Sequence, residues 1–405
     1  MYQSAASMFK NKKVLILGFG REGMSTYRFL RNMYPDMHLT IADKNEIKLD
    51  DKNVTLICGD SYMDSLNDFD IVMKSPGIAF LNVDIKDGTL VTCQTDLFLK
   101  FAPCRKVGIT GSKGKTTTST LIYDMLKEGG FDARLIGNIG VPVLEDINTV
   151  TPETIAVIEM SSHQLEFTTS SPEVAVLTNI YEEHLDHYRD GFRGYVNAKL
   201  NIVRRQKDGD TFIYNATQGL DGLCDLGKIK SHKVGVKKDA PLPFAVNNEH
   251  LLGEHNRQDI LFAFEAAKHF GVDIAAAERA VEKFSGIEHR MEKVGTFRGI
   301  TFYNDCIATI PHAVECAVEA LKNVDTLIFG GMDRGLDYSE FENYLKKSNI
   351  KNLIGTPATG HKICDKIEGA PQKTVYKAAN LDEAVKKAYE AVSYTHLRAH
   401  ETLSD

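Results

Sequence analysis

The stretch that most constrains this chain is Val107–Thr118, which reads VGITGSKGKTTT. A short apolar run enters a glycine-rich turn, and a helix-like pattern begins at Lys115. The backbone N–H groups of such a turn and the dipole of the following helix favour a bound phosphate. Lys115 would reach the outer phosphates of a nucleotide, and the Thr116 hydroxyl would ligate Mg²⁺. We therefore predict a strand, a phosphate-binding loop and a helix.

This loop departs from the strict phosphate-loop spacing, because Ile109 stands where the first glycine is expected. What remains is the variant T-G-x-x-G-K-T-T. The alternative is a glycine turn before an ordinary helix. We favour the nucleotide site, because Gly-Lys-Thr between a strand and a helix has few other uses.

A second glycine motif lies near the N-terminus, where the apolar run Val14–Leu17 is followed by G-x-G-x-x-G at Gly18–Gly23. Asp43 ends the next apolar run, and Ser75-Pro76-Gly77 follows a later one. Such glycines, followed by an acidic residue and a turn at the carboxyl end of a strand, indicate a Rossmann-like site for a nucleotide diphosphate. The alternatives are NAD, which the glycines alone suggest, and a plain α/β turn with a solvated Asp43.

The middle of the chain carries groups suited to metals. Glu159 ends an apolar run, and an acid at the carboxyl end of a strand beside a phosphate loop is a typical Mg²⁺ ligand. The segment Tyr181–His187 is rich in His and acids but lacks H-E-x-x-H, so it suits Mg²⁺ better than zinc. Taken alone, each histidine could be a surface residue and Lys199, on a predicted helix, a solvated lysine. His255-Asn256 could cap the next helix or contact a base.

Composition excludes several other classes of protein. Of the 405 residues, 43% are hydrophobic and 25% are charged, as in soluble globular proteins, and the net charge of −7 gives no reason to expect nucleic-acid binding. The seven cysteines include no C-x-x-C pair, so neither zinc nor a disulfide framework is indicated. We expect a cytoplasmic protein with no membrane segment, because no signal peptide and no long apolar run is present.

The last hundred residues contain two polar loops, Asn304–Thr309 and Gly330–Gly335, each after an apolar run. Their residue types bind anions or metals, although each alone could be a solvated turn. We expect a strand at Phe297–Tyr303 and a helix at Leu381–Ala391. The sequence after that helix is polar and unpatterned, so we expect residues 392–405 to be a foreign or readthrough tail, with a genuine disordered C-terminus as the alternative.

Together these motifs resemble those of the Mur ligases. The family's pattern occurs in order as TGSKGKTTT, EMSSHQLE, TNIYEEHLDHY, GEHN, EHRME, NDCIAT and GGMDRG, and the resemblance covers residues 12 to about 391. It implies three α/β domains: a Rossmann-like UDP-sugar-binding domain at 1–102, a central P-loop ATP-binding domain at 103–287 and a Rossmann-like glutamate-binding domain at 288–391. The implied reaction joins glutamate, expected to be D-glutamate, to UDP-N-acetylmuramoyl-L-alanine through an acyl phosphate, in peptidoglycan precursor synthesis. A monomer is expected.

The resemblance also implies roles for individual residues. The catalytic set is Lys115, His184 and Lys199, and a carbamylated Lys199 would bridge one of two Mg²⁺ sites. The metal ligands are Thr116, Glu159, His184 and Lys199. ATP would contact Gly111, Ser112, Lys113, Gly114, Lys115, Thr116, Thr117, Asn138, Asn256, Arg290 and Asp305. The UDP-sugar would contact Gly18, Gly20, Gly23, Asp43, Ser75, Gly77, Asn138, Ser161 and Gln164, and glutamate would contact Thr309 and Arg334.

The chain departs from the family pattern at several positions. Lys113 stands where Asn is usual, and Cys306 and Ile307 replace Ser and Lys. Asp259 replaces a frequent Asn. The family's final strand and glutamate-binding segment are absent, so we expect a truncated third domain. The alternatives are therefore the same chemistry with L-glutamate or another amino acid, or an inactive homologue that binds nucleotide or UDP-sugar. A nicotinamide dehydrogenase would rest only on the first glycine motif.

Overall fold

The computed structural model describes residues 7–145, 147–220, 222–306, 308, 310–333 and 336–401, with side chains described up to residue 391. The chain divides into two compact units. The larger unit comprises Met1–Asn248 with Asn256–Phe284, and the smaller unit comprises Glu249–His255 with Ser285–Asp405. Both units contain a parallel sheet whose strands alternate with helices along the chain, so the expected α/β class is confirmed.

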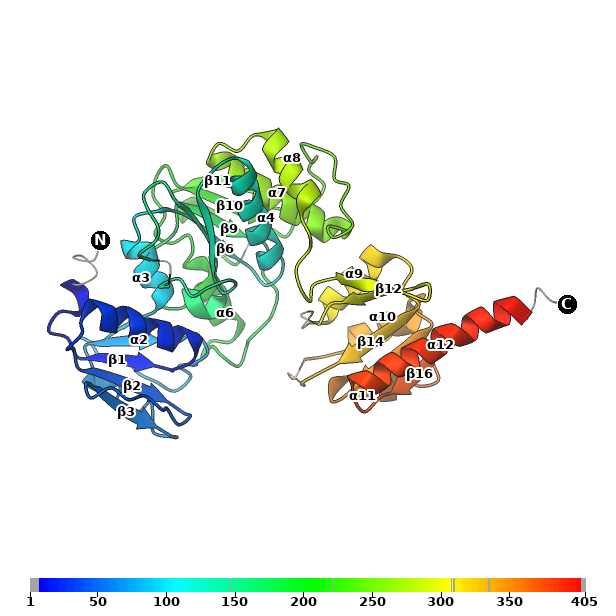
Figure 1. Ribbon diagram of the computed structural model, residues 1–405, viewed down its shortest axis with the longest axis horizontal. Helices are drawn as coiled ribbons and strands as arrows, with labels where there is room; N and C mark the ends of the chain where they lie inside the picture. The colour runs from blue at the N-terminus through cyan, green and yellow to red at the C-terminus, as the bar shows by residue number, and fades with distance from the viewer. Residues whose placement is uncertain are drawn as a thin grey trace. The chain divides into compact units, whose positions relative to one another are not determined.

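The larger unit begins with a five-stranded sheet of order β3-β2-β1-β4-β5, in which all neighbouring strands are parallel. Its strands are β1 (Val14–Leu17), β2 (Leu39–Asp43), β3 (Val54–Cys58), β4 (Ile71–Lys74) and β5 (Leu90–Thr92), and its helices are α2 (Arg21–Met33) and α3 (Gln94–Phe101). Figure 1 shows α2 running alongside this sheet, with both drawn in blue. The carboxyl ends of β1, β2 and β4 carry the first glycine motif, Asp43 and Lys74.

A second parallel sheet of the larger unit has the order β11-β10-β9-β6-β8-β7. Its strands are β6 (Arg105–Thr110), β7 (Ala133–Gly137), β8 (Ile155–Glu159), β9 (Val174–Leu177), β10 (Thr211–Asn215) and β11 (His232–Val236). Its helices are α4 (Lys115–Glu128), α5 (Ser162–Leu165), α6 (Phe192–Leu200), α7 (Gly253–His269) and α8 (Ile274–Lys283). β6 is central and pairs with β8 on one side and β9 on the other, which places the phosphate loop beside the ends of both neighbours.

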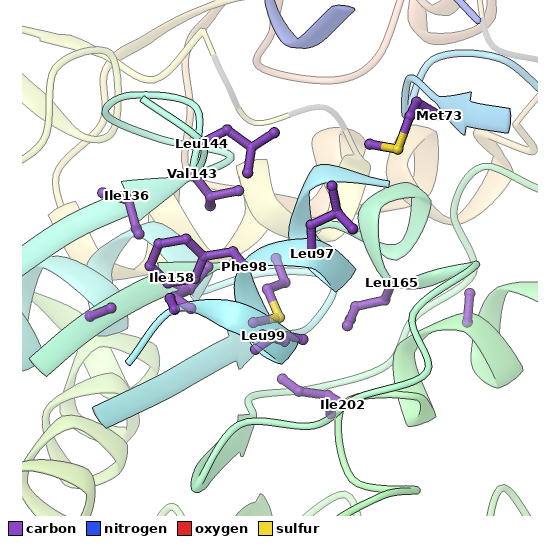
Figure 2. Close-up of a cluster of buried hydrophobic side chains, with 14 of the residues drawn as sticks. Met73, Leu97, Phe98, Leu99, Ile136, Val143, Leu144, Ile158, Leu165 and Ile202 are labelled. Carbon is purple, nitrogen blue, oxygen red and sulfur yellow. The ribbon is translucent and has the colours of Figure 1, made fainter. Parts of the chain in front are cut away.

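One hydrophobic cluster joins the two sheets of the larger unit. It contains Ile16 and Met73 of the first sheet together with Ile158 of the second. Figure 2 shows the side chains of α3, including Phe98, among residues of both sheets. Phe98 is completely buried, so α3 is a shared core element rather than a surface helix.

The smaller unit contains the hairpin β12 (Glu292–Phe297) and β13 (Ile300–Asn304), and a parallel sheet of order β14-β15-β16. The strands of that sheet are β14 (Thr326–Gly330), β15 (Asn352–Thr356) and β16 (Thr374–Lys377), and the helices are α9 (Pro311–Leu321), α10 (Ser339–Lys347), α11 (Thr359–Ile367) and α12 (Leu381–Glu401). The single strand expected at Phe297–Tyr303 is wrong. Arg298 and Gly299 have φ values of 53° and 79°, the left-handed conformation that a tight hairpin turn requires.

The C-terminal segment also differs from the expectation. Helix α12 continues past Ala391 to Glu401, where the sequence had suggested an unpatterned stretch. No glycine or proline interrupts residues 381–401, so nothing in the backbone chemistry ends the helix earlier. None of the helices in the described part of the chain is both long and apolar enough to cross a membrane.

Candidate nucleotide and metal site

Two glycines shape the loop between β6 and α4. Gly111 has a φ of +156°, and a Cβ there would lie 1.9 Å from the Thr178 hydroxyl. Gly114, with a φ of +83°, precedes the first turn of α4, and a Cβ there would lie 2.4 Å from Asp259. Since a side chain would strain the backbone and collide at both positions, the loop requires glycine at each.

The end of β9 holds this loop in place. The backbone N–H groups of Ser112 and Lys113 donate to the carbonyl and the side-chain oxygen of Asn179, at 2.9 and 2.8 Å. In return, the Thr178 hydroxyl and the Asn179 amide donate to the Lys113 carbonyl, at 2.5 and 3.0 Å. Two of the N–H groups that the sequence assigned to phosphate binding are thus used inside the protein.

Two lysines converge on the same carbonyl group. The Lys115 Nζ donates to the carbonyl oxygens of Gly111 and Ser112, each at 3.0 Å. The Lys199 Nζ donates to the Gly111 oxygen at 2.7 Å. Lys199 is only 2% exposed, so its interpretation as a solvated lysine is wrong. Burial, and then the charge of Lys115, hold the pKa of Lys199 well below its usual range.

A buried carboxylate lies on the neighbouring strand. Glu159 ends β8 and pairs in register with Ile109 of β6. Its two oxygens accept hydrogen bonds from the Thr116 hydroxyl at 2.8 Å and the Asn138 amide at 2.6 Å. No cluster of three or more His, Cys, Asp or Glu side chains suited to a metal occurs in the described ranges. The carboxylate and hydroxyl oxygens of Glu159 and Thr116 are nevertheless hard donors that fit Mg²⁺.

His184 lies in a group of aromatic rings from the segments that follow β8 and β9. Its φ of 54° is unusual for a residue with a side chain, and its ring meets that of His163 edge-on, with centroids 4.7 Å apart. The His163 ring also packs on His187, at 3.9 Å. Burial, followed by the charges of His187 and His184, lowers the pKa of His163 to about 3, so His163 is neutral at pH 7.

The first glycine motif is built by close packing between β1 and α2. A Cβ on Gly23 would lie 1.9 Å from the Gly18 carbonyl oxygen, and Gly18 itself has a φ of +87°. The Ser75 hydroxyl donates to that carbonyl at 2.9 Å. One carboxylate oxygen of Asp43 accepts the Phe19 N–H at 2.7 Å. Asp43 thus holds the loop in addition to standing where the sequence placed a nucleotide contact.

The remaining predicted UDP-sugar residues follow strands of both sheets, Gly20 and Gly77 in the first and Ser161 and Gln164 in the second. Apart from the adjacent residues, no described residue has an atom within 4 Å of the position that a Cβ would take on Gly20 or Gly77, so their surroundings are open. Ser161 caps α5, and its hydroxyl accepts the Gln164 N–H at 3.2 Å. The Gln164 amide donates to Glu22 of α2 at 2.7 Å, which links the second sheet to the first.

The other predicted contacts divide between the two units. Asn256 is buried inside α7, which begins at Gly253, so its possible role as a helix cap is wrong. In the smaller unit, an Asp305 carboxylate oxygen accepts the Met291 N–H at 3.0 Å, while Arg290 Nε has no hydrogen-bond partner among the described residues.

The predicted glutamate contacts, Thr309 and Arg334, lie outside the described residues.

Several supporting residues were missed by sequence reasoning. Thr178 and Asn179 hold the loop, Glu183 pairs with Lys113 at 2.6 Å, and the Tyr195 hydroxyl lies 2.7 Å from the Ser112 hydroxyl. The sequence carried a signal for Thr178, Asn179 and Glu183, because they belong to the TNIYEE segment, which directly follows a strand next to the loop.

Comparison with protein families assigns most of the chain. Residues 12–91 match the MurD-like N-terminal domain of Mur ligases, residues 109–267 match the Mur ligase middle domain, and residues 289–397 match the Mur ligase glutamate ligase domain.

Full-length relatives agree with this assignment. The UDP-N-acetylmuramoylalanine–D-glutamate ligase of Clostridium kluyveri is 33% identical over 94% of this chain and 89% of its own length. The ligase of the same name from Ligilactobacillus salivarius is 32% identical over the same shares.

Solved structures share the fold at low identity. The MurF ligase of Thermotoga maritima, solved in complex with ADP, gives a TM-score of 0.60 at 16% identity and covers 93% of this chain and 87% of its own. The UDP-N-acetylmuramate–alanine ligase MurC of the same organism gives 0.56 at 19%, covering 91% and 90%. Because three family domains and relatives above 30% identity span nearly the whole chain, this protein belongs to the Mur ligase family.

Proposed function

We propose that this protein is an ATP-dependent ligase that joins D-glutamate to UDP-N-acetylmuramoyl-L-alanine in peptidoglycan precursor synthesis. The observation that carries the proposal is the convergence of Lys115 and Lys199 on the Gly111 carbonyl, one strand away from the buried Glu159. The names of the 32–33% identical relatives supply the substrates. A cytoplasmic location and a monomeric state remain predictions.

In the proposed reaction, the alanyl carboxylate attacks the γ-phosphate of ATP, and ADP leaves. The resulting acyl phosphate is attacked by the glutamate amine, and phosphate leaves. Phosphoryl transfer of this kind depends on positioning and on neutralised charge. Lys115 would leave its two carbonyl partners to contact the outer phosphates, while Gly111 and Gly114 let the loop backbone approach them closely.

Thr116 and Glu159 are the residues that would hold Mg²⁺, and His184 would hold a second ion. When bound, Mg²⁺ neutralises charge on the transferred phosphoryl group. Their side chains suit the ion, since Glu159 and Thr116 offer oxygen donors that already meet at 2.8 Å. The Asn138 amide holds the second oxygen of Glu159 and so fixes the carboxylate plane.

We propose that Lys199 acts as a carbamate. An unprotonated amine adds to CO₂ and releases a proton, which converts a cation into an oxygen donor. The lowered pKa of Lys199 supports this, because a larger share of the amine is then unprotonated at neutral pH. A carbamate would also remove the repulsion between Lys199 and Lys115, which meet at one carbonyl.

The test is glutamate-dependent phosphate release. The purified protein is given ATP, Mg²⁺ and UDP-N-acetylmuramoyl-L-alanine, with D- and L-glutamate supplied separately, and products are weighed by mass spectrometry. We expect phosphate release and a glutamyl product with D-glutamate only. A product with L-glutamate would support the alternative acceptor, whereas no glutamate-dependent release with either would refute the ligase.

A further inference from the structure

A buried ion pair joins the two sheets of the larger unit. It links the carboxyl end of β4 in the first sheet to the segment that follows β8 in the second. Lys74 is the last residue of β4, and its Nζ lies 3.1 Å from Glu166, which directly follows α5. The Lys74 side chain is 1% exposed, and its ammonium lies 5.5 and 5.3 Å from the ring centres of Phe80 and Phe167. A charge buried this deeply is costly unless it is well paired.

Glu166 also contacts the segment after β9 that contains the predicted metal ligand His184. The same Glu166 oxygen that faces Lys74 lies 3.4 Å from His187 Nε2. The His187 ring packs on the His163 ring, which in turn meets the His184 ring, and the backbone N–H of His187 donates to the His184 carbonyl at 3.1 Å. Contacts therefore run without interruption from the first sheet to a predicted metal ligand.

Both ends of this connection adjoin a predicted ligand site. Lys74 directly precedes the Ser75-Pro76-Gly77 turn, which is expected to line the UDP-sugar site. His187 lies in the segment that supplies His184. Two further hydrogen bonds hold the backbone at Glu166, the middle residue of this connection, because the Asn201 amide donates to the carbonyls of Leu165 and Glu166 at 2.8 and 3.1 Å.

We propose that Lys74, Glu166 and His187 form a positioning bridge that sets the UDP-sugar turn at the correct distance from the phosphate-transfer site. This rests on the proposed function, since it assumes that the two sites hold the two reacting substrates. A shift of one reactant by about 1 Å can cost up to roughly a hundredfold in rate. The bridge fixes that distance without touching either reacting group.

The molecule contains a control triad of the same residue types in a more exposed position, since the Arg105 and Glu173 side chains are 41% and 30% exposed against 1% and 18% for Lys74 and Glu166. Arg105, Glu173 and His269 repeat the pattern of cation, glutamate and histidine, with Arg105 at 2.6 Å and His269 at 3.1 Å from one Glu173 oxygen. They lie at the start of β6, just before β9 and at the end of α7. The Arg105 triad therefore lies at the start of β6 and β9, at the opposite end of β6 from the Gly111–Thr116 loop.

The first measurement compares K74M/E166Q with R105M/E173Q. Each double variant removes a pair of opposite charges, so neither leaves a lone buried charge behind. In K74M/E166Q we expect kcat to fall about tenfold to a hundredfold, while the separate affinities for UDP and for ADP·Mg²⁺ change less than about threefold. R105M/E173Q should keep kcat. An unchanged kcat in K74M/E166Q, or an equal loss in the control, would overturn the proposal.

A second measurement needs no turnover. A bridge that touches both sites should make ADP·Mg²⁺ change the affinity for UDP by about fivefold or more, measured by calorimetry. We expect this coupling in the unaltered chain and in R105M/E173Q, and its loss in K74M/E166Q. Coupling that survives in K74M/E166Q would refute the bridge. If the unaltered chain shows coupling but no glutamate-dependent phosphate release, the proposed reaction fails, while the Lys74–Glu166–His187 connection between the UDP and ADP·Mg²⁺ sites is still supported.

Discussion

The loop Gly18–Gly23 and the loop Gly111–Thr116 both join a parallel strand to a helix, but different groups surround them. In the first loop, the glycines allow β1 and α2 to approach closely, and a carboxylate, Asp43, holds the backbone. At the second loop, Lys115 and the more distant Lys199 both donate to the Gly111 carbonyl, and the acid, Glu159, lies on the neighbouring strand.

This difference indicates a division of labour. A loop held by an acid suits a ligand that is bound by shape and by hydrogen-bond donors, such as an uncharged nucleoside portion and its diphosphate. A loop with two lysines and a separate carboxylate suits a phosphate that changes charge during reaction. Glycine spacing alone does not distinguish the two, because Asp43, Glu159 and Lys199 come from segments distant from the loops.

The largest effect should follow from Lys199→Ala, which removes the buried amine beside the second loop. We expect glutamate-dependent phosphate release to fall by about a hundredfold or more. If Lys199 works as a carbamate, acetate or formate should partly restore the rate by supplying an oxygen donor. The exposed Lys207→Ala is the control and should keep full activity. Lack of rescue would argue against the carbamate.

Gly23→Ala should have the next largest effect, on stability. Its Cβ would lie 1.9 Å from the Gly18 carbonyl oxygen, so the free energy of unfolding in urea should fall by about 3 kcal/mol. Gly20 has a φ of −72°, and a Cβ there would meet no described atom within 4 Å beyond the adjacent residues, so Gly20→Ala should change the stability by less than about 0.5 kcal/mol. Equal stability of the two variants would contradict the packing role.

Chelation of Mg²⁺ should affect the second loop only. With Mg²⁺ removed by EDTA, we expect ADP to bind about tenfold more weakly, while UDP affinity stays the same. Glu159→Gln should reproduce the weaker ADP binding with Mg²⁺ present, because the amide loses the charge that Glu159 offers the ion. A UDP affinity that falls with EDTA would break the proposed division between the loops.

The smallest effect is expected from Asp43→Asn. The Asp43 carboxylate accepts the Phe19 N–H at 2.7 Å, and an amide oxygen would accept it more weakly. We expect UDP to bind about fivefold more weakly, which corresponds to about 1 kcal/mol, with ADP·Mg²⁺ binding unchanged. Calorimetric titration with UDP and with ADP·Mg²⁺ would measure both affinities. A loss of ADP affinity instead of UDP affinity would contradict the assignment of Asp43 to the UDP-sugar site.

Sequence patterns predicted strands well where an apolar run ends at an acid or a glycine. The bounds of β1 and the end of β8 match the expectation, because Gly18 and the residues after Glu159 interrupt each run. The hairpin of β12 and β13 was missed, since a turn with Arg298 in a left-handed conformation carries little sequence signal. The last part of helix α12 was not predicted, because the sequence after Ala391 is polar and carries no helical pattern of apolar residues.

The candidate site was predictable in residue type but not in environment. Lys199 looked solvated because its partner, the Gly111 carbonyl, lies 88 positions earlier in the chain. Ser161 and Gln164 were expected to contact the UDP-sugar, and the structure adds a cap and a link to Glu22 that no local pattern reveals. The bridge at Lys74 depends on contacts 92 positions apart and left no motif.

Helix α3 has a consequence for how the larger unit comes apart. Because Phe98 and its neighbours complete the core of both sheets, neither sheet can open while the other keeps its packing. The two sheets should therefore melt in one cooperative step, although they correspond to separate family domains. A nucleotide held by either loop would then slow hydrogen exchange in the strands of both.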